Sequence, residues 1–188
     1  FSNPEQARKA GIETVHQNLA LVEDLTVWQN LFLSRELTSG FGPLRMMNRR
    51  AMTKEATTMV STLAINVPSV KSRVRRLSGG QRQAVAIARA AGWGSSIVIM
   101  DEPTAALGVQ ETAKVEELIH DLKSRGISIM LISHNFDQVL RLSDAVTVMR
   151  SGRTVASRRA ANTSGDELVG LVTGAVPADS DYLKGESA

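Results

Sequence analysis

Three short apolar runs, alternating with helical patterns, constrain the fold of this chain more than any other feature of its sequence. Ile97–Met100 is wholly apolar, and further runs at Ile127–Ile132 and Ala145–Met149 are rich in β-branched residues. Helical spacing separates them, around Val115–Leu122 and again at Phe136–Leu142. Short apolar runs of this kind are typical of strands buried on both faces. The order strand, helix, strand, helix, strand predicts an α/β fold with a parallel sheet and helical crossovers.

The first half of the chain has a different pattern, which predicts mainly helix. Gly11–Val15 is a short strand candidate, and Thr26 with Gln29 fits a capping box that opens a helix through Leu33. Apolar residues recur at helical spacing across Asn48–Ala64, at Met52, Ala56, Met59, Val60 and Leu63. A helical segment is therefore expected between the first strand and the α/β half, with breaks at about residues 18–30 and 77–95.

Composition excludes several classes of protein. The chain has no cysteine, which excludes disulfides and thiolate metal sites. Its longest apolar runs are far shorter than the roughly 20 residues of a membrane-spanning helix. The net charge is +3, and the basic residues are scattered apart from two clusters, at Arg73, Arg75 and Arg76 and at Arg158–Arg159. A solvated face explains such clusters better than a nucleic-acid site does.

The segment Leu77–Gln81 carries the strongest chemical signal. Ser78 can cap a helix and Gln81 can close a capping box, while Gly79 and Gly80 allow a ligand to approach the backbone closely. A helix start also carries partial positive charge, so this segment suits phosphate. The alternative is an ordinary helix start with glycines at a tight corner.

Acidic residues follow the apolar run Ile97–Met100 directly. Asp101 and Glu102 would lie at the carboxyl end of a parallel strand, where ligands bind in such sheets. One carboxylate can hold Mg²⁺, and the other can orient and deprotonate an attacking water. The alternative is that both acids solvate the end of the strand.

His134 follows the second apolar run in the same way. An imidazole there can hydrogen-bond a phosphate or the attacking water. A lone histidine at the end of a strand more often has a structural role, and His16 and His120 are interpreted as structural or surface residues.

The order of these motifs is more specific than any one of them, and with them the chain resembles the ABC-type ATPases over roughly residues 11–175. Leu77–Gln81 matches the signature motif of that family, and Ile97–Asp101 matches its Walker B strand. Glu102 stands in the place of the catalytic glutamate, His134 in that of the switch histidine and Gln17 in that of the Q-loop glutamine. The stretches His16–Leu19 and Thr104–Leu107 are most similar to carbohydrate importers.

The resemblance implies a P-loop NTPase-type parallel sheet with helical crossovers and an inserted α-helical subdomain. It divides the chain into the end of the N-terminal core with the Q-loop at 1–17, the helical subdomain at 18–76, the RecA-like catalytic core at 77–175 and a flexible tail at 176–188.

The implied mechanism is ATP hydrolysis with Mg²⁺ in a head-to-tail dimer. Ser78, Gly79, Gly80 and Gln81 of one subunit would close over ATP held by the other, with Asp101 and Gln17 at the metal. Glu102 would polarise water, and Gln17 and His134 would sense the γ-phosphate. The implied partners are a second nucleotide-binding subunit, a membrane permease docked by the helical subdomain and, indirectly, a solute-binding protein. The resemblance implies no nucleic-acid partner, and it implies that the subunit lies at the cytoplasmic face of the membrane.

The sequence departs from the family pattern in two places. The phosphate-binding sequence G-x-x-x-x-G-K-[ST] does not occur, and the sixteen residues before Gln17 leave no room for it. We therefore expect that an N-terminal part of the core is absent and that the chain alone is inactive. Gly108 also stands where many relatives carry Asp, in the loop after Walker B. Two other functions remain open: a soluble ABC ATPase of DNA repair or translation, and a non-catalytic regulatory cassette.

Overall fold

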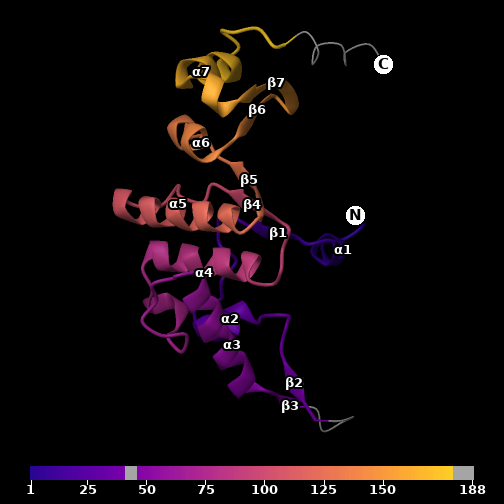
Figure 1. Cartoon of the computed structure of the whole chain (residues 1–188), viewed down its shortest axis with the longest axis vertical. Coiled ribbons are helices and arrows are strands. Elements are labelled where there is room, and N and C mark those ends of the chain that lie inside the picture. Colours follow the sequence, from indigo (N-terminus) through magenta and orange to yellow (C-terminus); the bar gives the residue numbers. More distant parts are fainter. Residues whose placement is uncertain (41–45, 180–188) are drawn as a thin grey trace. The chain divides into compact units, whose positions relative to one another are not determined.

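The computed structural model describes residues 1–40 and 46–179. The chain divides into two compact units, a first unit at Phe1–Ile132 and a second at Ser133–Ala188 (Figure 1). Each unit has its own sheet and helices, and each is described by itself below.

A parallel sheet of three strands forms the centre of the first unit. Its strands are β1 (Ile12–Val15), β4 (Ile97–Asp101) and β5 (Ser128–Ile132), in the order β1-β4-β5. Both pairs are parallel, and the register places Val15 beside Met100 and Asp101 beside Ile132. The predicted parallel α/β sheet is confirmed, and the carboxyl ends of its strands lie along one edge.

Two helices cover one face of this sheet. α4 (Gly79–Ala91) packs against β1, α5 (Val109–Ser124) packs against β5, and the two helices pack against each other (Figure 1). On the covered face, Val98 and Met100 of β4 are fully buried. Burying apolar side chains contributes about 1.5–3 kcal/mol each, so this layer is a main source of stability for the unit.

The opposite face of the sheet is open, and the expectation that the strands are buried on both faces is wrong. Ile97 is 36% exposed, Met130 57% and Ile132 48%. The register places Ile99 and Met130 side by side on this face, so the apolar side chains form one surface. The cause is that α4 and α5 lie on the same side of the sheet, so that alternate residues of β4 and β5 face outward.

The predicted helical segment is confirmed as a small bundle that packs on α4. It contains α2 (Val27–Leu31), α3 (Arg49–Thr62) and the 3₁₀ helix η2 (Val74–Arg76). The core residues shared by these elements are fully buried: Val27, Leu31, Met52, Ala56 and Val74. The capping box of Thr26 and Gln29 is present. Three short elements lie before and between these helices: α1 (Pro4–Lys9), β2 (Thr38–Ser39) and β3 (Met46–Met47).

The second unit is built on a β-hairpin. β6 (Ala145–Arg150) pairs antiparallel with β7 (Arg153–Arg159), so the expectation that Ala145–Met149 is a strand of the parallel sheet is wrong. The reason is local: Ser151 and Gly152 both have positive φ, as two-residue hairpin turns require, and they return the chain beside β6. The remaining elements are α6 (Phe136–Leu142), the 3₁₀ helix η3 (Ala160–Asn162) and α7 (Gly165–Thr173).

Arg158 ties the end of the described chain to this unit. Its guanidinium binds Glu167 at 2.8 Å and Asp179 at 2.6 and 2.8 Å. The hydrogen bonds from Arg158 lower the pKa of the Asp179 carboxyl. Of the tail predicted from residue 176 onward, residues 180–188 lie outside the described residues.

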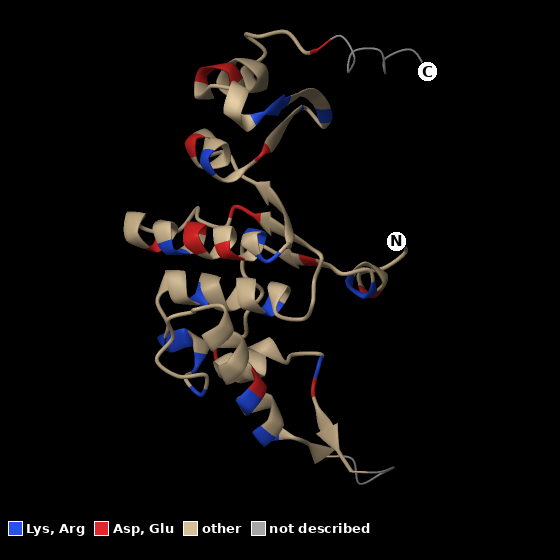
Figure 2. Cartoon of the chain, viewed as in Figure 1, with Lys and Arg blue, Asp and Glu red and all other residues tan. Residues whose placement is uncertain are grey.

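The basic clusters noted in the sequence are paired with carboxylates. Arg73 and Arg75 both contact Asp24, at 3.7 and 2.9 Å. Figure 2 shows charges of both signs spread over the ribbon. Internal ion pairing therefore accounts for much of each cluster. Within residues 1–40 and 46–179, none of the helices combines the length and apolarity needed to cross a bilayer.

Candidate functional site

A cleft of about 770 Å³ in the first unit lies at the carboxyl ends of β1 and β4. Gln17, Asp101, Glu102 and Gly79 line it. Parallel strands end at this edge, which explains why segments far apart in the sequence meet here. Four of the eight residues selected from the sequence thus line one cleft.

The other four residues lie elsewhere. Ser78, Gly80 and Gln81 line a second cavity of about 530 Å³, beside α3 and α5. His134 follows β5 by two residues and belongs to the second unit, so its role at the cleft stays a prediction.

Glu102 has a left-handed backbone directly after β4. Its φ is 47°, and its N–H donates to the carbonyl of Ile132 at 2.9 Å. This conformation costs a non-glycine residue about 1–2 kcal/mol. Strain of this kind persists where surrounding contacts enforce it, and it is concentrated at functional sites. The backbone therefore marks Glu102 as a candidate functional residue independently of the motif.

The strain at Glu102 can be measured by comparing two substitutions. Glycine adopts positive φ without steric cost but gains entropy in the unfolded chain. We expect Glu102→Gly to be at least as stable as Glu102→Gln, by up to about 1 kcal/mol, in urea unfolding. If Glu102→Gly is clearly the less stable variant, the left-handed backbone at this position is not strained.

The loop after Gln17 is held by the helix α4. Leu19 and Ala20 have φ values of 58° and 47°, and the Arg89 guanidinium donates to their carbonyls at 2.9 and 2.6 Å. Burial lowers the pKa of Arg89, and the nearby Glu13 carboxylate acts in the opposite direction. One end of α4 therefore fixes the loop that carries Gln17 into the cleft.

The other end of α4 begins with the predicted capping box. The Gln81 N–H donates to Ser78 Oγ at 3.3 Å, and the Ser78 N–H donates to Gln81 Oε1 at 3.0 Å. The Gln81 side chain also donates to the carbonyl of Asn66 at 2.9 Å. The capping box is confirmed, and it fixes the orientation of the first turn of α4.

Close packing gives the two glycines of this turn a second role. A Cβ on Gly79 would lie 3.2 Å from Leu107 Cδ2, and one on Gly80 would lie 3.0 Å from Glu111 Cβ. Glycine is therefore favoured here by the approach of the chain after β4, in addition to any ligand. Sequence reasoning missed Glu111, although a glutamate at the third position of a helix can accept a hydrogen bond from the amide of the N-cap residue, here Gly108.

The oxygen donors of the cleft fit a magnesium ion. Asp101 and Glu102 supply carboxylates and Gln17 supplies an amide carbonyl. Mg²⁺ is usually held by one or two carboxylates, with water and phosphate oxygens completing its shell. Within the described part of the chain, no group of three or more acidic, histidine or cysteine side chains forms a metal cage of its own. This donor set suits an ion that arrives with a phosphate ligand.

Comparison with known proteins gives consistent matches. A family model described as "ABC transporter" matches residues 2–105. The fructose import ATP-binding protein FrcA of Rhizobium meliloti is 45% identical over 93% of this chain and 69% of its own length. The xylose/arabinose import ATP-binding protein XylG of Sulfolobus acidocaldarius is 39% identical over 92% of this chain and 67% of its own. The ribose import ATP-binding protein RbsA of Bacillus subtilis is 37% identical over 93% of this chain, which spans 34% of that protein.

Solved structures agree on the fold. A nucleotide-free ATP-binding cassette from an ABC transporter aligns with 97% of this chain and 71% of its own at a TM-score of 0.70 and 24% identity. A dimeric post-hydrolysis ATP-binding cassette bound to ADP and Pi aligns with 84% of this chain and 68% of its own, at a TM-score of 0.65 and 22% identity.

Proposed function

This chain belongs to the ABC transporter family of ATPases, and from that premise we propose that it acts in the ATP-binding subunit of an importer that takes up a sugar. The relatives above are named for the import of fructose, of xylose and arabinose, and of ribose. Each is 37–45% identical to this chain over an alignment that covers more than nine-tenths of this chain. A monosaccharide is therefore the proposed class of cargo.

The observation that carries the proposal is the convergence of Gln17, Asp101 and Glu102 on one cleft. These groups come from the ends of two neighbouring parallel strands, and Gly79 from the start of α4 lines the same cleft. Acidic and amide oxygens beside a helix start suit a metal-bound phosphate chain. The left-handed backbone of Glu102 at this position supports the proposal, because strain of this kind is concentrated at functional sites.

We assign a separate task to each polar group. Asp101 and Gln17 would hold Mg²⁺, which would supply positive charge that neutralises the phosphate oxygens. Glu102 orients the attacking water and takes a proton on its carboxylate. His134 hydrogen-bonds the γ-phosphate, and Ser78–Gln81 present backbone N–H groups to the nucleotide of a second subunit.

The same proposal includes the partners and the division of the chain. Residues 1–17 end at the Q-loop, the helical subdomain at 18–76 docks a permease, and residues 77–175 form the catalytic core. The subunit pairs head to tail with a second nucleotide-binding subunit, most simply a copy of itself. It lies at the cytoplasmic face of the membrane, bound to a permease that receives solute from a solute-binding protein on the opposite side.

Uptake measurements test the proposal directly. Cells lacking the gene are expected to lose uptake of at least one labelled sugar among ribose, xylose, arabinose and fructose, and to regain it with the wild-type gene. Affinity purification from detergent-solubilised membranes is expected to recover a permease. Unchanged uptake of all four sugars, together with recovery of ribosomes or DNA instead, would support a soluble ABC ATPase and overturn the proposal.

The isolated chain is expected to bind ATP weakly. Its 188 residues contain no G-x-x-x-x-G-K-[ST] loop, whose amides and lysine supply the main grip on the phosphates. The cleft side chains alone offer mostly negative charge and depend on Mg²⁺ to attract a nucleotide. Titration with a fluorescent ATP analogue checks this expectation, and micromolar affinity would contradict it.

A further inference from the structure

Glu111 bridges the two segments that the proposed mechanism treats as separate. It lies in the first turn of α5, and its two carboxylate oxygens accept hydrogen bonds from different backbone amides. Oε1 accepts from the Gly80 N–H at 3.4 Å, and Oε2 accepts from the Gly108 N–H at 3.4 Å. The first amide belongs to the signature helix α4, and the second to the end of the loop that follows β4.

The surroundings of this carboxylate favour its ionised form. The hydrogen bond from the Gly80 amide lowers the pKa of Glu111 most, and hydrogen bonds from the Ser78 hydroxyl and the Gly108 amide lower it further. The backbone of Gly80 also lies close to the Glu111 side chain, since a Cβ on Gly80 would lie 3.1 Å from Glu111 Cγ. Charge and packing therefore hold the two segments together at one residue.

The loop joined in this way is short and carries a proposed functional group. It runs from Glu102 to Gly108, and its Leu107 also packs against Gly79. Both glycines of the signature motif therefore contact this loop or the helix that follows it. A shift of Glu102 or its neighbours has a direct route to the amides at the start of α4.

We propose that Glu111 is a positioning residue that couples the loop after β4 to the phosphate-facing first turn of α4. The assignment deepens the proposed function and rests on it for the role of the signature amides. Both contacts are long for N–H···O hydrogen bonds, so a phosphate oxygen can take the place of the carboxylate at Gly80. When the Gly80 amide donates to a phosphate oxygen instead, the Glu111 carboxylate loses one of its two hydrogen bonds. The change at the signature motif is then transmitted through Glu111 to Gly108.

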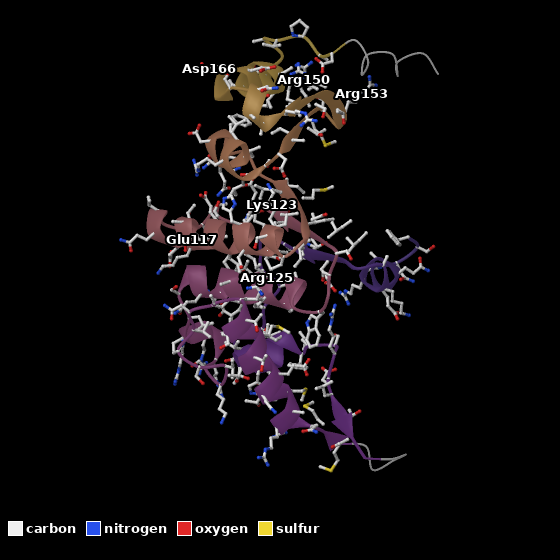
Figure 3. The ribbon with its side chains drawn as sticks, viewed as in Figure 1. Glu117, Lys123, Arg125, Arg150, Arg153 and Asp166 are labelled. Carbon is white, nitrogen blue, oxygen red and sulfur yellow. The ribbon has the colours of Figure 1, made fainter. Side chains whose placement is uncertain are left out.

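The test is an NMR titration of the 188-residue chain. The Glu111 carboxyl carbon and the Gly80 and Gly108 amides are followed as the pH falls from 7, without nucleotide. We expect both glycine amides to shift with one common midpoint, equal to that of the Glu111 carboxyl. Glu117, labelled in Figure 3, is an exposed carboxylate on the same helix and provides the matched site for a control substitution.

Two substitutions distinguish the effect of the two hydrogen bonds of Glu111 from the effect of removing a negative charge from the same helix. In Glu111→Gln one of the two oxygens is replaced by an NH₂ group, which cannot accept from a backbone amide, and the side chain no longer titrates, so the common transition of Gly80 and Gly108 is expected to be lost. Glu117→Gln removes the same charge and should leave that transition in place. Unchanged signals elsewhere show that Glu111→Gln remains folded, and if it unfolds, the three midpoints of the wild-type chain decide alone.

Different results bear on the two proposals. Separate midpoints for Gly80 and Glu111, or a transition that persists in Glu111→Gln, would overturn the coupling. Sugar uptake that does not depend on the gene would overturn the proposed function and leave the coupling between the segments measurable.

Discussion

Glu102→Gln is expected to slow ATP hydrolysis by about 10²- to 10⁴-fold, the range typical for loss of a general base. The substitution keeps the size of the side chain and the left-handed backbone but removes the group that accepts a proton. Because Asp101 and Gln17 are unchanged, nucleotide binding is expected to remain. The variant should therefore accumulate in a nucleotide-bound state in which hydrolysis is the slow step.

The measurement requires an active ATPase assembly that contains both this chain and a phosphate-binding loop, so that Glu102 takes part in turnover. Steady-state ATPase rates are compared with retention of labelled ATP. Glu55→Gln is a matched control, because Glu55 is exposed on α3 and belongs to neither cavity. Turnover within a factor of two of the wild type in Glu102→Gln would remove Glu102 from its proposed role.

Arg89→Met is expected to lower the free energy of unfolding by about 2–3 kcal/mol, because it removes charged hydrogen bonds from two strained residues. The guanidinium donates to the carbonyls of Leu19 and Ala20, both of which have positive φ. Methionine fills similar space but donates nothing, so the loop after Gln17 loses its attachment to α4. The amides of residues 19 and 20 are expected to exchange with solvent faster than in the wild type.

Arg82→Met is the matched control for this prediction. Arg82 lies on the same helix and forms an exposed ion pair with Glu23 at 3.2 Å. Exposed pairs contribute about 0–1 kcal/mol, so this variant should lose much less stability in urea unfolding. Equal losses in the two variants would mean that the Arg89 contacts add nothing specific to the loop.

Local signals explain why much of the first unit could be predicted from the sequence. The capping boxes at Thr26 and Ser78 depend on residues three positions apart, and both are present. The short helix Pro4–Lys9 carries similar signals, since Asn3 caps it and Pro4 begins it, but a polar six-residue helix with no buried residue has no apolar periodicity to reveal it.

The errors concern pairing and layers, which depend on contacts distant in sequence. An apolar run such as Ala145–Met149 has the same composition in a parallel sheet and in a hairpin, and the turn that follows decides between them. In the same way, the sequence of β4 and β5 does not say which faces the helices cover. The meeting of Gln17, Asp101 and Glu102 at one cleft was easier to predict, because the ends of parallel strands meet at one edge whatever covers their faces.

The open side of the parallel sheet affects how these 188 residues behave in solution. The side chains of Ile97, Met130 and Ile132 expose an apolar surface to solvent, and β1 and β5 are the edge strands of that sheet. Exposed apolar surfaces of this kind associate with one another and bind hydrophobic dyes, and edge strands can pair with strands of another molecule. A high protein concentration is therefore expected to promote aggregation through this apolar surface, and ligand titrations are best made with dilute protein.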